Sequence, residues 1–361
     1  MFKQNVLFGG RIFKTAVAVL LTAVVCHLLG WPPMFAVITA IVTIEPTARD
    51  SIKKAFVRFP ASAIGAAYSV LFTYLLGDSP FPYAFVTLLT IYGCCLLKLH
   101  AGILVATLTG VAMISTIHDE YVSSFFVRLG TTTIGLSISS LVNLWVIRPN
   151  YSRDIAERTK QLLVDISRYL ERRSREIIQH QPLHNETREQ YQAALKTLES
   201  IEILCDYQKK EWSFHRFRRE DIRPFHYNMK KLTLLRRMLY HLGNLHDLPP
   251  QKDLLDKETA DAFRIIMESI NILVEHDLSR GSERTRQAVA QMLRQRFKLA
   301  SQQIGQDNLS GDDQPLISDE ALLLFELAAL MDIADEFRHI QQLEARQESQ
   351  STMETADRQQ G

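Results

Sequence analysis

The sequence predicts an all-α protein: a six-helix transmembrane domain, built from two inverted three-helix repeats, followed by a cytoplasmic helical bundle. Three observations support this prediction. Residues 1–149 hold 10 Lys and Arg and 5 Asp and Glu, whereas the rest of the 361 residues hold 31 and 35. Long apolar runs fill the first part, and charge-rich helical periodicity fills the second. One polar pattern occurs twice in the first part, 70 residues apart.

Six apolar segments are expected to form the helices of the membrane domain. They lie at about 12–29, 32–45, 56–76, 82–97, 101–117 and 125–147. Most approach the roughly 20 residues that a spanning helix needs, and the second and fifth are short. No convincing cleavage site follows the first segment, which is therefore interpreted as a retained helix rather than a signal peptide. We expect an integral protein of the inner cell membrane, within the lipid bilayer.

Lysine and arginine concentrate in alternate connections of these segments. The basic positions are Lys3, Arg11 and Lys14 at the start, Arg49, Lys53, Lys54 and Arg58, then Lys98, and finally Arg148 and Arg153. The connections at 30–33, 77–80 and 118–120 contain neither residue type. The positive-inside rule therefore places both termini in the cytoplasm. Arg128, near the outer end of the sixth segment, is the exception.

The repeated pattern is a polar stripe headed by an arginine. Its members lie at offsets 0, 4, 7, 11 and 15, which fall on one narrow face of an α-helix. The stripes are Arg58, Ser62, Gly65, Ser69 and Thr73 in the third segment, and Arg128, Thr132, Gly135, Ser139 and Asn143 in the sixth. Residues 31–72 align with 101–142 without gaps, and three spans separate the two arginines. An odd number of spans reverses direction across the membrane, so we expect inverted repeats with one arginine near each face.

Such stripes are typical of a pathway for an anionic solute. An arginine at bilayer depth costs several kcal/mol unless it snorkels, pairs or faces water. Its planar fork suits a carboxylate, hydroxyls could replace lost water, and Tyr68, Tyr74 or Trp31 could flank an aromatic ring. Two alternatives stay open: Arg58 could only set orientation from the basic connection, and the small residues could form a helix-packing seam. Arg128 opposes the charge rule and is the better candidate for function.

Two further positions are candidates for coupling or gating. Glu45 and Pro46 follow only about 13 apolar residues, and a proline with an acid at this end predicts a short or broken helix. Glu45 could pair with Arg58 or carry a coupling proton, and an ordinary interfacial acid is an equally good interpretation. His27, within the first segment, could carry protons or be a hydrogen-bonded core histidine.

The second part has helical periodicity nearly throughout. Helices are expected at about 151–180, 186–211, 225–246, 251–279, 282–303 and 318–347. This gives a membrane domain at 1–150 and a helical bundle at 151–347, with the boundary at 148–150. Residues 348–361 are rich in Gln, Ser and Glu, and disorder is predicted for them.

No feature of the sequence indicates an enzyme. Motifs of the types G-x-x-x-x-G-K-[ST], H-E-x-x-H, G-x-S-x-G and paired CxxC are missing, so no catalytic residue and no cofactor is assigned. The four cysteines lie in apolar spans or cytoplasmic helices, which favours reduced thiols. His241, His246 and Asp247 lack tetrahedral ligand spacing, and no metal is expected. No nucleic-acid partner is expected either.

Several of these residues together resemble the aromatic acid exporter family, which includes fusaric-acid-resistance-type efflux proteins. The resemblance covers residues 1–150, and its motif is the run from Pro46-Thr47 through Arg58-Phe59-Pro60-Ala61-Ser62-Ala63-Ile64-Gly65, echoed by Arg128-Leu129-Gly130-Thr131-Thr132-Thr133-Ile134-Gly135 and closed by Asn143 and Arg148-Pro149. It implies export of aromatic or other organic carboxylates without ATP hydrolysis, by an oligomer, namely a dimer, with basic residues along the route. Pro60 departs from the pattern, since the second copy and the family have glycine there.

We therefore expect a secondary transporter that exports organic, in particular aromatic, carboxylic acids. Its partners would be small organic anions, the bilayer and a second copy of the chain. Two alternatives remain open at this point. The membrane half could be a passive organic-anion channel with arginines that set charge selectivity. It could also be the anchor of a sensor or binding module that acts through the cytoplasmic bundle.

Overall fold

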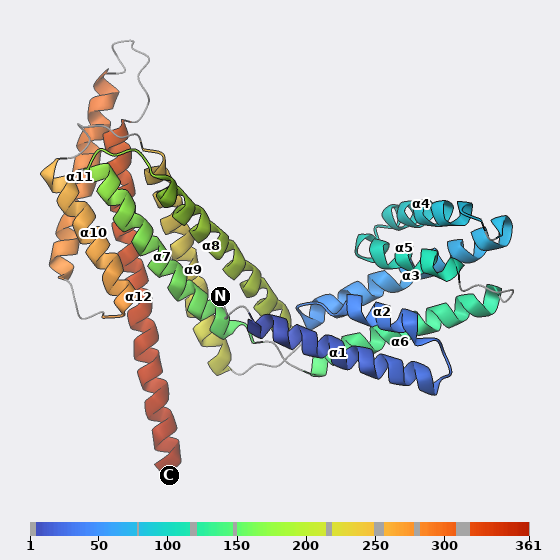
Figure 1. Ribbon diagram of the computed structural model, residues 1–361. Coiled ribbons are helices and arrows are strands. Elements are labelled where there is room, and N and C mark those ends of the chain that lie inside the picture. The colour runs from blue at the N-terminus through green and yellow to red at the C-terminus, as the bar shows by residue number, and fades with distance from the viewer. Residues whose placement is uncertain are drawn as a thin grey trace. The chain divides into compact units, whose positions relative to one another are not determined.

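The computed structural model describes residues 5–77, 79–115, 121–146, 150–213, 219–248, 256–277, 282–307 and 318–360 (Figure 1). Every regular element in these ranges is a helix, so the all-α class is confirmed. The chain divides into two compact units: the first is Met1–Asn150 with Tyr207–Arg216, and the second is Tyr151–Asp206 with Phe217–Gly361. The predicted boundary residues 148–149 and the connection 118–120 lie outside the described residues.

The first unit contains six α-helices and one short 3-10 turn within the described residues. They are α1 (Asn5–Leu28), α2 (Pro33–Thr43), α3 (Ala48–Leu76), α4 (Phe81–Leu96), η1 (His100–Gly102), α5 (Ile103–Ile114) and α6 (Tyr121–Trp145). Three stretches are long and apolar enough to cross a membrane: Gly10–Leu28, Ala48–Leu76 and Tyr121–Trp145. The apolar helices α2 and α4 and the stretch from η1 through α5 are shorter, so α4 joins the two segments that were expected to be short.

The break after α2 has a local cause. Pro46 has no backbone N–H, and a proline disfavours helical backbone in the residue before it. The helix accordingly ends at Thr43, and α3 begins at Ala48 after four residues outside any helix. Thr47 caps α3, because its hydroxyl accepts a hydrogen bond from the Asp50 N–H at 3.1 Å. The predicted short helix is confirmed, and the basic segment after it is continuous with α3.

The helices of the first unit exchange partners between the two halves of the sequence. Helix α3 packs on α5, α6 packs on α2, and α3 and α6 pack on each other. Helix α1 lies against α2 and α6, and α4 lies against α3 and α5, as Figure 1 shows. Each outer helix therefore contacts the short helix of its own half and the long helix of the other half.

Two stripe glycines permit these contacts. A Cβ atom added at Gly65 would lie 2.3 Å from the Ala106 carbonyl oxygen on α5, and one added at Gly135 would lie 2.4 Å from the Ala36 carbonyl oxygen on α2. The 70-residue alignment pairs these glycines with each other and these alanines with each other. Close packing of α3 is thus retained although Pro60 lies inside the helix.

The second unit contains six helices in its described part. They are α7 (Ser152–Ile178), α8 (Asn185–Trp212), α9 (Arg219–His246), α10 (Lys257–Glu275), α11 (Glu283–Asp307) and α12 (Asp319–Gln360), and the end of α8 is grouped with the first unit. Helix α7 packs on α9 and α10, and α12 packs on α9, α10 and α11. Buried apolar residues follow the helical period, as in α7, where Leu162, Ile166 and Leu170 are fully buried.

Helix α12 continues beyond the residues where it was expected to end. Composition predicted disorder from residue 348 onward, whereas the helix extends to Gln360. Glutamine, glutamate, methionine and arginine are good helix formers, so a helix that is already nucleated can propagate through this segment.

The glycine contacts give a first prediction. We expect Gly65→Ala to lower the stability of the protein by about 1–3 kcal/mol, because the new methyl group overlaps a backbone carbonyl that cannot rotate away. The matched control is Gly10→Ala in α1, where an added Cβ meets nothing within 4 Å. Thermal unfolding of the detergent-solubilised protein measures both. If Gly65→Ala melts with the control, the contact is not tight.

Candidate functional site

The two polar stripes meet inside the first unit. All ten stripe residues are buried, five on α3 and five on α6. The hydroxyls of Ser62 and Thr132, which occupy the same position in the two stripes, lie 3.4 Å apart. One helical face therefore points inward on each helix, and α3 and α6 contact each other along it.

The middle of each stripe is closely packed. Gly65 and Gly135 face the backbones of α5 and α2 rather than an open space. The Ser139 hydroxyl donates to the Leu136 carbonyl oxygen of its own helix at 3.1 Å. The Ser69 and Thr73 hydroxyls are buried and have no hydrogen-bond partner among the described residues. The stripe is thus partly a packing seam and partly a row of unused hydroxyls.

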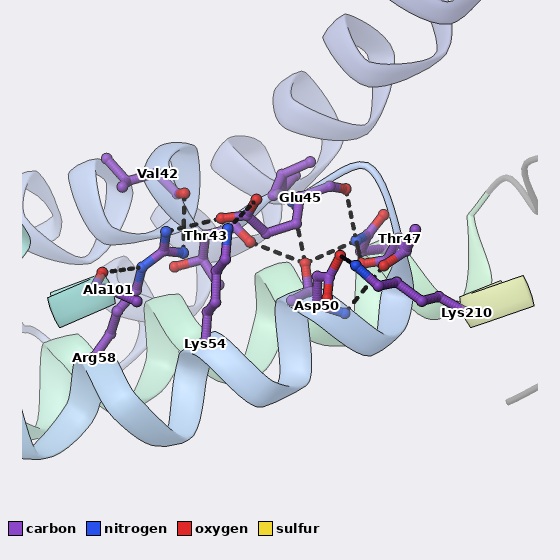
Figure 2. Close-up of polar contacts among 12 residues, drawn as sticks. Val42, Thr43, Glu45, Thr47, Asp50, Lys54, Arg58, Ala101 and Lys210 are labelled. Atoms are coloured by element: carbon purple, nitrogen blue, oxygen red, sulfur yellow. Dashed lines mark hydrogen bonds and ion pairs between the residues drawn. The ribbon is translucent and has the colours of Figure 1, made fainter. Parts of the chain in front are cut away.

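Arg58 is fully engaged within the protein. Its Nη2 atom donates to Glu45 Oε1 at 2.8 Å, its Nη1 to the Val42 carbonyl oxygen at 3.1 Å, and its Nε to the Ala101 carbonyl oxygen at 3.3 Å (Figure 2). The other Glu45 oxygen accepts from Lys54 Nζ at 2.9 Å. The carboxylate therefore lies between two cations, and of the alternatives considered for Glu45 its pairing with Arg58 is present.

Asn143 holds the connection between α2 and α3. Its Nδ2 atom lies 3.0 Å from the Glu45 carbonyl oxygen, 3.2 Å from that of Thr47 and 2.7 Å from Ser51 Oγ. Its Oδ1 atom accepts from Lys14 Nζ at 2.9 Å. The Asn143 side-chain amide thus binds the chain around Pro46, so the last residue of this stripe makes structural contacts.

The start of α3 has a second anchor in Tyr207–Arg216, the part of the chain that is grouped with the first unit. Glu211 Oε1 accepts from the Ala48 N–H at 2.7 Å. Lys210 Nζ lies 3.0 Å from Asp50 Oδ2 (Figure 2). Burial raises the pKa of Glu211, and the hydrogen bond from Ala48 and the charge of Lys14 oppose that shift. Sequence reasoning did not find this anchor, because 163 residues separate Ala48 and Glu211.

Arg128 has a different environment. The residue is 3% exposed, and its Nη2 atom donates to Thr109 Oγ1 at 2.5 Å. Its guanidinium carbon lies 3.9 Å from the centre of the Phe35 ring, a cation–π contact. Nε and Nη1 have no hydrogen-bond partner, and no carboxylate pairs with this arginine, within the part of the chain that the structure describes. Arg128 is therefore a buried cation whose Nε and Nη1 atoms donate no hydrogen bond to the described chain.

The difference between the two arginines is also present in the sequence. The 70-residue alignment places Ser115 opposite Glu45, so the second half has a hydroxyl where the first has a carboxylate. The alignment also places Val105 opposite Phe35, and the aromatic ring beside Arg128 comes from the other half of the sequence. The sequence analysis did not identify Phe35, although comparison of the two halves at positions 35 and 45 could have done so.

The other candidate residues lie elsewhere. His27 is exposed at the last turn of α1, so the expectation of a histidine buried in the first span is wrong. The part of α1 before His27, residues 16–25, is apolar except for Thr22, and this pattern does not distinguish an inward from an outward face. Trp31 lies over Gly130, where an added Cβ would be 2.2 Å from the indole ring. Tyr74 is exposed and contacts Tyr121 edge-on, and Tyr68 is half-buried. The hydrogen bond and the cation–π contact of Arg128 involve Thr109 and Phe35 rather than either tyrosine.

The described residues contain no group of three or more His, Cys, Asp or Glu side chains that could hold a metal ion. Cys26, Cys94 and Cys205 are buried and Cys95 is exposed, and no disulfide joins these four cysteines.

Comparison with known proteins identifies the family. Residues 6–146, almost the whole first unit, match the family model described as aromatic acid exporter family member 1. A UPF0421 protein of Oceanobacillus iheyensis is 37% identical over 93% of this chain and 96% of its own length, and one of Bacillus cereus is 36% identical over 94% of each. A UPF0421 protein of Staphylococcus aureus is 39% identical over 67% of this chain and 74% of its own. The chain therefore belongs to the aromatic acid exporter family and resembles the UPF0421 proteins over nearly its whole length.

Proposed function

We propose that the protein is a secondary transporter that exports organic, in particular aromatic, carboxylic acids, and that Arg128 receives the carboxylate. Membership of an exporter family supports transport. The observation that carries the assignment to Arg128 is a guanidinium group that is 3% exposed and has no carboxylate partner among the described residues.

The buried positive charge of Arg128 favours an anion beside it. An arginine keeps its proton in proteins, and a buried charge without compensation costs several kcal/mol. Thr109 and Phe35 compensate it only in part, because a hydroxyl and an aromatic face carry no net charge. A solute carboxylate would accept charge-assisted hydrogen bonds from the unused Nε and Nη1 donors. The Phe35 ring would also give the solute an apolar neighbour, which favours an organic anion over an inorganic one.

Arg58 and Glu45 have a different part in the proposal. Glu45 occupies, at Arg58, the place that the solute carboxylate takes at Arg128, and so it acts as an internal counterion. An anion that reaches Arg58 has to displace Glu45 from it. We place the coupling step here, in the release of Glu45 by a proton or by movement of the connection around Pro46.

The exchange of helix partners supports two inverted three-helix repeats. The contacts of Gly65 with Ala106 and of Gly135 with Ala36 are what a pseudo-two-fold axis would generate from one another. In this proposal all six helices of the first unit belong to the membrane domain, and both termini are cytoplasmic in the inner membrane. The second unit is then a cytoplasmic helical bundle, and the transporter is a homodimer.

The test of the proposed function is transport by reconstituted protein. Arg128→Gln should reduce the rate of labelled benzoate movement across proteoliposomes with an imposed proton gradient by about ten- to hundredfold, since charge-assisted hydrogen bonds contribute roughly 1.5–3 kcal/mol. Arg49→Gln, which removes an exposed arginine at the start of α3, should transport at the normal rate. The proposal is wrong if the wild-type protein moves benzoate no faster than protein-free liposomes, or if Arg128→Gln matches Arg49→Gln.

The two arginines should also differ in their effect on stability. Arg58→Gln leaves the half-buried Glu45 beside only Lys54, and Glu45→Gln leaves the buried Arg58 without its counterion, so each should cost up to about 3–5 kcal/mol. The double substitution should cost less than the sum of the single ones, because neither charge is then left alone.

Arg128→Gln should leave the melting temperature unchanged or raise it, since it removes a charge that nothing in the described protein neutralises. Thermal unfolding in detergent measures all four variants. Lys54→Gln is the control for a partly exposed partner of Glu45 and should have a small effect. Equal destabilisation by Arg58→Gln and Arg128→Gln would contradict the distinction between the two sites.

A further inference from the structure

The second unit contains a cavity that transport through the first unit does not explain. Its volume is about 630 Å³, and residues of α7, α9 and α12, with His276 at the end of α10, line it. Pockets for small molecules commonly have volumes of about 300–1,000 Å³. The cavity is therefore of a size that would hold a compact organic molecule.

Two buried polar atoms of its lining have no partner in the described chain. They are the hydroxyl of Thr159 and the side-chain carbonyl oxygen of Gln341, in residues that are 2% and 3% exposed. The Gln341 amide nitrogen is engaged, because it donates to the Leu273 carbonyl oxygen at 3.1 Å and lies 3.3 Å from His276 Nδ1. A buried polar atom without a partner is costly, so a bound molecule with matching polar groups would be stabilised at both positions. The carbonyl oxygen of Gln341 requires a donor there, and the Thr159 hydroxyl can donate.

The charged residues that line the cavity have a small excess of positive charge. Arg153, Lys160 and Glu157 are exposed lining residues, and Lys231 on the wall is paired with Glu344, so three cations stand against two carboxylates. Burial lowers the pKa of His276, and the charges of Lys231 and Lys160 lower it further, against a smaller opposing effect of Glu344. A positive potential thus reaches the inner wall.

The wall also has apolar parts. Leu163 and Phe337 line the cavity, and both are fully or almost fully buried. They offer no hydrogen bond to a bound molecule, and an inorganic anion would leave them facing its hydration water. An organic anion satisfies the polar atoms and covers this surface as well.

We propose that this cavity binds a small organic carboxylate that carries a hydroxyl or N–H donor, such as a hydroxylated aromatic acid. The carboxylate lies toward Lys160 and the Thr159 hydroxyl, the donor reaches the Gln341 carbonyl oxygen, and the carbon skeleton contacts Leu163 and Phe337. The site needs no residue of the transport pathway, so it is independent of the function proposed for Arg128.

The test is calorimetric titration of the full-length protein in detergent, in an Arg128→Gln background that removes the proposed transport site. We expect 4-hydroxybenzoate to bind at one saturable site. Benzoate lacks the donor and 4-hydroxybenzyl alcohol lacks the carboxylate, so each should bind at least about fivefold more weakly. Inorganic phosphate should not compete, because it has no surface for the apolar wall.

Substitutions then locate the site. Lys160→Gln should weaken 4-hydroxybenzoate binding about tenfold and Thr159→Val about fivefold, since they remove a charged and a neutral partner. Lys298→Gln, at an exposed lysine of α11 outside the cavity, is the matched control and should bind normally. Thr159→Val keeps the shape of the side chain and Lys160 is exposed, and melting temperatures equal to that of the parent confirm folding.

The proposal is overturned if no saturable binding occurs in the Arg128→Gln background, or if Lys160→Gln and Thr159→Val both bind like Lys298→Gln. Equal weak binding of all three aromatic probes would show partition into detergent and would overturn it too. Failure of transport in the wild-type protein would leave these results unchanged, so the two proposals can fail separately.

Discussion

A guanidinium group buried among apolar helices needs compensation for its charge, and this compensation differs between Arg58 and Arg128 in the first unit. Arg58 has a carboxylate and two backbone carbonyl oxygens, all within 3.3 Å. Arg128 has one hydroxyl and one aromatic face in the described chain. Arg58 can therefore be stable without a ligand, whereas Arg128 has electrostatic capacity for one.

The environment of Arg58 depends on the break after α2. Because α2 ends at Thr43, Glu45 lies outside any helix and can reach across to α3. Asn143 and Ser51 hold this non-helical chain through its backbone, and Lys14 holds Asn143. Pro46 thus allows Glu45 to act as the counterion of Arg58, because in an unbroken helix the helical period would set the direction of the Glu45 side chain.

Close backbone contact provides the geometry around both arginines. Gly65 and Gly135 bring each long helix against the short helix of the other half. Where the halves differ, the difference is complementary: Trp31 lies over Gly130, and the aligned positions hold Ala101 and Pro60. The large residue and the glycine that meet in one half thus align with a small residue and a proline in the other, and α3 keeps its close contact at Gly65 although it contains Pro60.

The features that depend on neighbouring residues could be predicted from the amino-acid sequence alone. Helical class, the break at Pro46 and the inward face shared by each stripe follow from backbone preference and from the helical period, which act over a few residues. The pairing of Glu45 with Arg58 was one of the alternatives that the sequence left open for Glu45, and the structure contains it.

The groups that each side chain contacts depend on the tertiary structure. Gly65 and Gly135 face the backbones of neighbouring helices, and Phe35 lies beside Arg128. The Asn143 amide binds the chain around Pro46, and His27 is exposed. The tertiary structure also brings four helices around the cavity of the second unit. These outcomes depend on contacts between residues far apart in the sequence, and hydrophobic helices of similar composition do not encode by local pattern which of their faces will meet.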